Sequence, residues 1–173
     1  PLTGFKGRID EGGIRVPFIV RGPGITSGSV CHTPVVGYDF LPTFYDLAGG
    51  NPVIRPLPED VDGVSIEPLL ANPNASLGRP DDAVYFHRTL FNKSAIRQGD
   101  YKLLVTWDSN GNIESRSLYD LSENPVEEGR DIVATNSVLA DAMEADLLSY
   151  FKSLIPQPST LGITFYDGDF TPL

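Results

Sequence analysis

The strongest constraint on the fold is a run of strand-like segments in the second half of the chain. Residues 101–107 (YKLLVTW) have the strongest strand pattern, and residues 113–119 return as their partner after a loop that contains an Asn-Gly pair. Such a pair between two strand-like runs is typical of a β-hairpin. Residues 83–87 and 94–97 predict two further strands, so we expect a small antiparallel sheet of four strands.

An amphipathic helix is predicted after these strands, over residues 137–154. Its apolar side chains recur at helical spacing, at Leu139, Met143, Leu147, Tyr150 and Leu154. Ser137 can cap the amino terminus of this helix, and Pro156 ends it. Because a small sheet is only marginally stable by itself, we expect the helix to bury its apolar stripe on one face of the sheet.

The first half of the chain has a different texture. Residues 15–21 (RVPFIVR) are apolar, β-branched and followed by glycine, which is typical of a buried strand. Residues 36–47 predict a helix with apolar side chains around much of its girth, and Asp39 belongs in its first turn. The polar, proline-containing stretch at residues 72–82 is interpreted as a linker that marks a subdomain boundary.

The composition argues against several classes of function. The net charge is −10 and the sequence pI is near 4.5, so the chain repels nucleic acid and anionic membrane surfaces. No apolar run approaches the length of a membrane span. The single cysteine, Cys31, forms no internal disulfide, and the adjacent His32 is poorly placed as its base because neighbours on an extended segment point to opposite faces.

Residues suited to metal binding do not form a convincing set. His32 and His87 are the only histidines, and no group of Asp, Glu, His or Cys has the spacing of metal ligands. Asp167-Gly168-Asp169 resembles part of a calcium loop, but we interpret it as an exposed turn because the other ligands are absent. The glycine-rich loop at residues 4–17 is different: glycines permit close approach to a ligand, and Lys6 can serve as a point charge for an oxyanion.

This loop resembles the second signature region of the sulfatases, a family of the alkaline-phosphatase-like superfamily. The resemblance rests on Lys6-Gly7 followed by Glu11-Gly12-Gly13-Ile14-Arg15-Val16-Pro17. Further blocks follow in the family's order at residues 21–24 (RGPG), 39–49 (DFLPTFYDLAG), 62–65 (DGVS), 95–103 (AIRQGDYKL) and 118–125 (LYDLSENP). Since the chain also opens without Met on a loop, we expect it to be the truncated C-terminal part of a sulfatase.

Sulfatases hydrolyse sulfate esters, and the resemblance implies this activity for the full-length parent. The family uses a formylglycine, made from the first residue of a Cys/Ser-x-Pro-x-Arg motif, beside a bound calcium. That motif is absent here, because in Cys31-His32-Thr33-Pro34 the proline is one place late and Val35 stands where arginine would be. We therefore expect no metal or cofactor in this fragment, Ca²⁺ and formylglycine in the parent, and no activity from the fragment alone.

One catalytic position carries over by the resemblance. Lys6 matches the family lysine that contacts the sulfate and the leaving-group oxygen, where a pre-placed cation stabilises growing negative charge. Glu11 and Arg15 are interpreted as structural support, since an arginine beside a glycine pair can brace the loop through a carboxylate. His87 and Arg88 follow a strand and are candidates for lining the substrate entrance, because the family's small C-terminal subdomain borders the active-site cleft.

The resemblance also sets the expected fold class: partial α/β, alkaline-phosphatase-like, followed by an α+β subdomain. We expect residues 1–75 to be the trailing portion of the catalytic α/β domain, residues 83–155 to form the sheet and its helix, and residues 156–173 to be a tail. Arg97 and Lys102 are interpreted as structural residues of the sheet. Missing neighbours of the first part would leave apolar surface open, so self-association of the fragment is a hypothesis.

Two alternatives stay open. Phosphonate and phosphodiester hydrolases share this scaffold and parts of these motifs. A non-catalytic module that binds glycans or partners would need an exposed aromatic platform, for which Trp107 and Tyr101 are the candidates. The sulfate ester itself is open among sulfated glycans, aryl sulfates and steroid sulfates, and a periplasmic or extracellular location is expected from the family alone.

Overall fold

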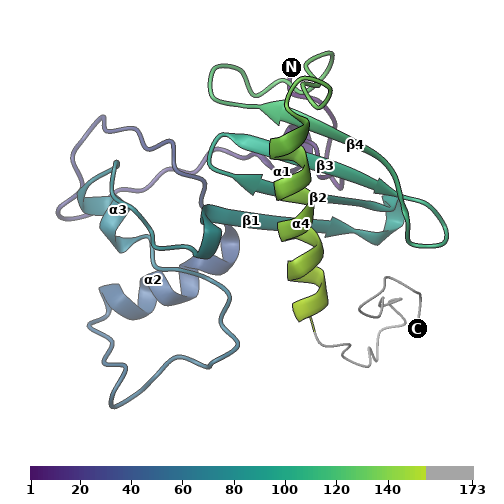
Figure 1. The fold of residues 1–173 in the computed structure, drawn as a ribbon. Helices are drawn as coiled ribbons and strands as arrows, with labels where there is room; N and C mark the ends of the chain where they lie inside the picture. The colour runs from purple at the N-terminus through teal and green to yellow at the C-terminus, as the bar shows by residue number, and fades with distance from the viewer. Residues whose placement is uncertain (155–173) are drawn as a thin grey trace. The chain divides into compact units, whose positions relative to one another are not determined.

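A four-stranded antiparallel sheet dominates the computed structural model, which describes residues 1–154 (Figure 1). Its strands are β1 (Ala83–Arg88), β2 (Lys93–Gln98), β3 (Tyr101–Trp107) and β4 (Ile113–Asp120). They lie in the order β1-β2-β3-β4, and each pair of neighbours is antiparallel. The four-stranded sheet predicted from the sequence is therefore confirmed.

Short connections set the register of this sheet. The strands β1 and β2 are joined through a short 3-10 helix, η3 (Thr89–Phe91). A two-residue turn joins β2 to β3, with Gln98 opposite Tyr101. Gly99 in this turn has a φ of +53°, a left-handed conformation that glycine adopts at little cost.

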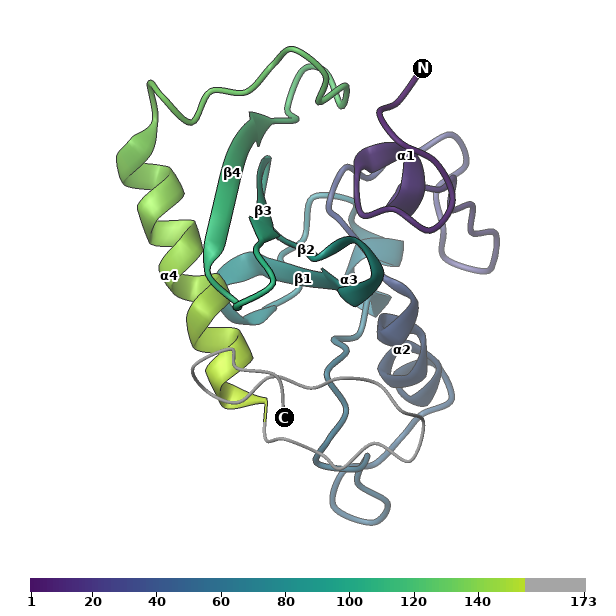
Figure 2. The same ribbon diagram turned by 90° about the vertical axis from the view of Figure 1, so that its right-hand side faces the viewer.

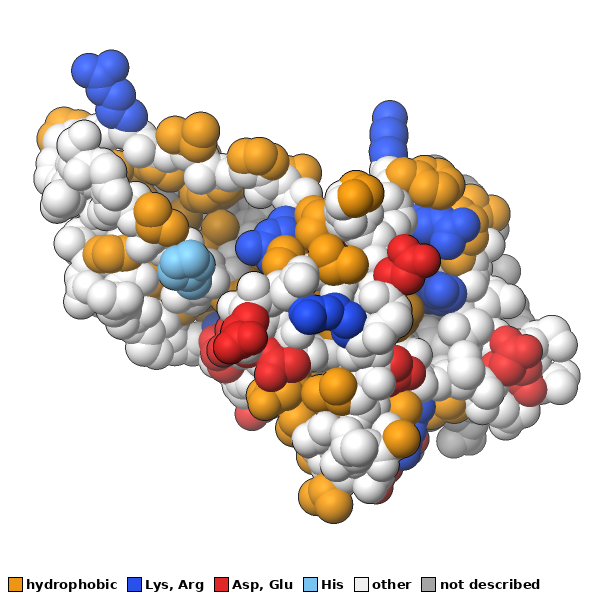
Figure 3. Space-filling model, turned by 90° about the horizontal axis from the view of Figure 1, so that it is seen from above, with side chains coloured by type: hydrophobic (Ala, Val, Ile, Leu, Met, Phe, Trp, Pro, Cys, Tyr) orange, Lys and Arg blue, Asp and Glu red, His pale blue; other side chains and the backbone are white. Residues whose placement is uncertain are grey.

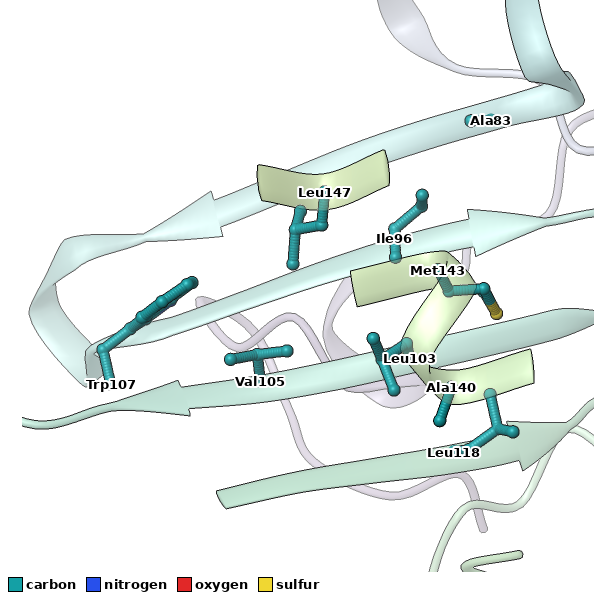
Figure 4. Packing of buried hydrophobic residues seen from close by; sticks show 9 residues of the cluster. All are labelled: Ala83, Ile96, Leu103, Val105, Trp107, Leu118, Ala140, Met143 and Leu147. Atoms are coloured by element: carbon teal, nitrogen blue, oxygen red, sulfur yellow. The ribbon is translucent and has the colours of Figure 1, made fainter. Parts of the chain in front are cut away.

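The helix α4 (Ser137–Ser153) packs against one face of the sheet, as predicted (Figure 4). The buried core between them consists of Ala83, Ile96, Leu103, Val105, Trp107, Leu118, Ala140, Met143 and Leu147. Each large apolar side chain in such a core contributes about 1.5–3 kcal/mol by leaving water. Ser137 is the first helical residue and Asn136 holds the N-cap position, so the predicted Ser137 cap is wrong. Pro156 and the tail lie outside the described residues.

The amino-terminal segment covers the other face of the sheet, so the sheet lies between this segment and α4 (Figure 2). The segment contains the short helix α1 (Glu11–Ile14). Ile9 packs there with Ala95 and Leu104 of the sheet. Consequently Pro1–Val16 groups with the chain from Ala83 onward, whereas the sequence-based division placed residues 1–75 together.

The second unit of the chain, Pro17–Asp82, is helical and irregular. It contains η1 (Gly37–Asp39), α2 (Phe40–Leu47), α3 (Glu67–Ala71) and η2 (Pro80–Asp82). The first two confirm the helix predicted over residues 36–47. Asp39 is buried where they meet, accepts the backbone N–H of Val64 at 3.1 Å and pairs with Arg79 at 2.7 Å. Of all the helices within residues 1–154, none combines the length and apolar character that crossing a bilayer requires.

The strand predicted over residues 15–21 is wrong. The backbone there is irregular, and the side chains of Val16 and Ile19 are 75% and 90% exposed. A strand needs a neighbour for its backbone hydrogen bonds, and within the described residues the sheet contains only β1 to β4. An apolar, β-branched run predicts β propensity, but a pairing partner decides whether the strand forms.

Candidate functional site

Lys6 lies at the tip of a tight turn in the amino-terminal segment. The backbone N–H of Arg8 donates to the carbonyl oxygen of Phe5 at 3.0 Å, which makes Lys6 and Gly7 the two central residues. Gly7 has a φ of +89°, the value that the third residue of a type II turn requires and that glycine adopts most easily. The Lys6 side chain is exposed, so the turn presents its ammonium group to solvent.

Glycines allow α1 to pack directly on this turn. Gly12 donates its backbone N–H to the carbonyl oxygen of Thr3 at 2.7 Å. A Cβ atom at Gly12 would lie 2.6 Å from that same oxygen, and one at Gly13 would collide with the carbonyl oxygen of Arg8. The adjacent glycines therefore hold the turn and the helix in backbone contact.

A buried ion cluster lies at the start of α1. It joins Glu11 of α1, Lys102 of β3 and Glu127 of the loop after β4, which are 1%, 0% and 2% exposed. The Lys102 Nζ atom donates to the carbonyl oxygen of Ile9 at 2.7 Å and to Glu11 Oε1 at 3.0 Å, and it lies 2.8 Å from Glu127 Oε1. Two hydrogen-bond acceptors and a second carboxylate thus surround one ammonium.

Two arginines and one backbone amide complete the cluster, which we call the Lys102 cluster. Arg97 and Arg15 each place Nη1 3.6 Å from Glu11 Oε2. Burial lowers the pKa of Arg97, and the Glu11 carboxylate opposes that effect. An arginine so placed is still charged at neutral pH. Glu127 Oε2 accepts the backbone N–H of Glu11 at 2.9 Å, so the first residue of α1 is fixed by both its side chain and its backbone.

The structure brings together four residues that the sequence singled out and one that it did not. Glu11, Arg15, Arg97 and Lys102 meet in one place, although they come from α1, the residue after it, β2 and β3. Glu127 was missed, because it follows the last matching sequence block and no local pattern marks it. The available signal was Lys102 itself, since a lysine inside an apolar strand needs a buried counter-charge.

His87 and Arg88 do not converge on one site. They are adjacent on β1, so their side chains point to opposite faces of the sheet. His87 Nδ1 lies 2.8 Å from Ser94 Oγ, and the His87 ring meets the Phe151 ring edge-on with 5.3 Å between centroids. Partial burial lowers the pKa of His87, which is still exposed near the end of β1, and this favours the neutral ring at pH 7. His87 therefore belongs to the face that α4 covers, and Arg88 to the other.

The two aromatic residues considered for a glycan platform also face α4. Trp107 is only 7% exposed, and its Nε1–H donates to Ser94 Oγ at 2.7 Å. Tyr101 packs against the same core. Trp107 is therefore buried in the core, and Tyr101 is partly buried against it.

The described part of the chain offers little metal chemistry. Cys31 is an exposed free cysteine. Within residues 1–154, no group of three or more His, Cys, Asp or Glu side chains is placed to hold a metal ion. The Asp167-Gly168-Asp169 motif lies outside the described residues.

Comparison with known families matches this arrangement to a recognised domain. A family model described as N-sulphoglucosamine sulphohydrolase, C-terminal, matches residues 5–152. The match runs from the lysine turn almost to the end of α4, so it includes every residue of the Lys102 cluster.

Individual relatives agree with this match. The chain is 42% identical over 64 residues to the extracellular sulfatase SULF-1 homolog of Drosophila melanogaster, which covers 37% of this chain and 5% of that protein. It is 30% identical over 121 residues to the N-acetylglucosamine-6-O-sulfatase of Bacteroides thetaiotaomicron, which covers 65% of this chain and 20% of that protein.

One solved structure, of a protein bound to its own substrate D-glucosamine-2-N,6-O-disulfate, matches this chain with a TM-score of 0.57 and 25% sequence identity. The match covers 74% of this chain and 26% of that one. The chain therefore spans from 5% to 26% of the length of these three relatives.

Proposed function

Because the chain belongs to the sulfatase family, we propose that it forms the C-terminal part of a sulfuric ester hydrolase in which Lys6 is a catalytic residue. The construction of the lysine turn supports this proposal. The turn is packed against α1 through two glycines, and α1 is tied to the sheet through the buried Lys102 cluster. A lysine that served only solubility would need no such support.

The proposed role of Lys6 follows from the charge changes during ester cleavage. As the S–O bond breaks, the departing oxygen gains negative charge. An ammonium held in advance at that position stabilises the charge without reorganising, and it can also contact a sulfate oxygen. The Lys102 cluster takes no part in the chemistry in this proposal, because its charged groups already bond to one another; it keeps the turn in place.

We assign the nucleophile and the metal to the rest of the full-length protein. These are the formylglycine and the Ca²⁺, carried on an alkaline-phosphatase-like α/β domain of which Pro17–Asp82 would be the trailing portion. The residues at positions 1–154 do not fit a calcium site, so no step proposed for this chain involves the metal. The chain alone is accordingly expected to release no sulfate.

The proposed substrate is a sulfate ester of a sugar. One relative is named N-acetylglucosamine-6-O-sulfatase, and the matching solved structure contains D-glucosamine-2-N,6-O-disulfate as its substrate. Both names describe amino sugars with a 6-O-sulfate. An extracellular or periplasmic location is part of the proposal, supported by a relative that is named an extracellular sulfatase.

The experiment that tests this function replaces Lys6 by alanine in the full-length protein. Release of sulfate from glucosamine 6-sulfate is measured. Loss of one donor to a developing oxyanion costs about 10²–10³-fold in kcat, and we expect a fall of that size. Lys152→Ala is the matched control, because Lys152 is an exposed lysine in the last turn of α4.

Two outcomes would contradict the proposal. An unchanged kcat in Lys6→Ala would remove the catalytic role of the lysine. Faster cleavage of a phosphodiester than of the sulfate ester by the unaltered protein would favour a phosphodiester hydrolase on the same scaffold.

We also propose that the 173-residue chain self-associates when it is separated from its parent. Exposed hydrophobic side chains are visible on the face drawn in Figure 3. Those of the second unit include Phe18, Ile19, Phe44, Val53 and Ile54. Large exposed apolar surface promotes association. Light scattering should give a mass that rises with concentration, and a constant monomer mass would contradict the proposal.

A further inference from the structure

A small cavity beside the lysine turn lies outside the Lys102 cluster. It is lined by Arg8, Ile9, Asp10, Phe91 and Lys93, and its volume is about 90 Å³. Sites for whole drug-sized ligands are several times larger, at about 300–1,000 Å³. A space of this size suits one small polar group of a larger molecule.

The Arg8 guanidinium is held in this cavity by two aromatic rings. Its Cζ atom lies 5.0 Å from the centroid of Phe5 and 5.3 Å from that of Phe91. Cation–π contacts on the guanidinium fix its orientation and remove water from its faces. The edge of the guanidinium, where its N–H groups point, is left to make hydrogen bonds.

One of these N–H groups has no partner. The Nε atom of Arg8 is buried and makes no hydrogen bond within the described residues. A buried donor without a partner destabilises the structure, and more so when the group is charged. Because the Nε atom is closed to solvent, a ligand in the cavity would meet the Nη groups of Arg8 instead, and paired N–H groups of a guanidinium bind carboxylate or sulfate oxygens in pairs.

The charges around the cavity favour an anion. Arg8 and Lys93 contribute two positive charges, and Asp10, which is 7% exposed, contributes one negative charge. The balance of two against one leaves a local positive site on a chain whose net charge is −10. A confined positive site of this kind attracts anions despite the overall field.

We propose that this cavity binds a second anionic group of the substrate, a sulfate or carboxylate next to the ester that is cleaved. The inference rests on the proposed function, because it places the cleaved ester at Lys6. Lys6 and Arg8 are two residues apart in one turn, so their Cα atoms are no more than about 7 Å apart. The substrate class is then a sugar that carries two anionic groups, only one of which is hydrolysed.

The test compares two sugars in the full-length protein: glucosamine 6-sulfate, with one anionic group, and glucosamine 2-N,6-O-disulfate, with two. Arg8→Met should raise KM for the disulfate about 10- to 100-fold, because that is the loss of affinity expected when hydrogen bonds to a charged group are removed. The KM for the monosulfate and both kcat values should change little. Arg8→Lys, which keeps the charge but loses the fork, should recover only part of the effect. Arg130→Met, an exposed arginine elsewhere in the same unit, is the control.

A second measurement keeps this inference separate from the role of Lys6. Dissociation constants of both sugars are measured by calorimetry in the Lys6→Ala background, with and without Arg8→Lys. Selective loss of affinity for the disulfate supports the cavity even when turnover is lost. Equal changes for both sugars, or no change for either, would show that the cavity holds only water and that Arg8 merely shapes the turn.

Discussion

Replacing Lys102 by methionine tests the Lys102 cluster most directly. Methionine keeps most of the volume but removes the ammonium that lies between the buried carboxylates of Glu11 and Glu127. Removing one partner of a buried ion pair costs about 3–5 kcal/mol, because the remaining charge is left uncompensated. Two carboxylates are left here, with arginines no nearer than 3.6 Å, so the upper part of that range applies. Total stabilities are only about 5–15 kcal/mol, so the loss should be large.

Urea unfolding, monitored by circular dichroism, measures this loss as a change in the free energy of unfolding. The double variant Lys102→Met/Glu127→Gln should lose at least about 1 kcal/mol less than the sum of the two single changes. The reason is that Glu127→Gln removes a carboxylate charge that Lys102→Met leaves without a cation. Lys152→Met is the control at an exposed lysine and should stay within about 0.5 kcal/mol of the original. A loss below about 1 kcal/mol in Lys102→Met, or strict additivity in the double variant, would refute the reasoning.

Two further predictions concern the turn and the α4 face. Gly13→Ala should lower the free energy of unfolding by about 1–3 kcal/mol, because its Cβ would meet a carbonyl oxygen. Gly37 has open space around it, so Gly37→Ala should change the free energy of unfolding little. Chemical denaturation compares the two variants. The pKa of His87 is lower in the folded chain than in the unfolded chain, where it is about 6.5. As the pH falls below about 6.5, the unfolded ring takes up the proton first, so the free energy of unfolding should decrease until the pH reaches the folded pKa. Thermal melts from pH 7.5 to 5 should show a weaker decline for His87→Asn, and an identical decline would contradict the burial argument.

The sheet and α4 were predictable because their signals are local. The alternation in residues 101–107 and the Asn-Gly pair after it specify a strand and a hairpin whatever the rest of the chain does. The 3.6-residue period of residues 137–153 likewise specifies one apolar helical face. Packing the two apolar faces together then follows, because neither is stable in water alone.

The strand prediction failed, and the compact units differ from the predicted division, where distant parts of the chain decide the outcome. Residues 15–21 have the composition of a strand, but composition does not supply a neighbouring strand to pair with. Pro1–Val16 packs on the sheet because Ile9 contacts the apolar side chains of Ala95 and Leu104, and no linker-like sequence marks the boundary after Val16. A linker at residues 72–82 indicates one boundary without excluding another.

The Lys102 cluster lies between these two cases. Lys102 stands in an apolar strand, and with α4 on one face and the amino-terminal segment on the other, either direction of its side chain leads into the interior. A lysine so placed requires buried carboxylates, and this can be inferred from sequence and topology. The loop after β4 and the glycines of α1 determine which carboxylates pair with Lys102, because they bring Glu127 and Glu11 to the same ammonium. The sequence therefore specifies that a counter-charge is required, and tertiary packing specifies its source.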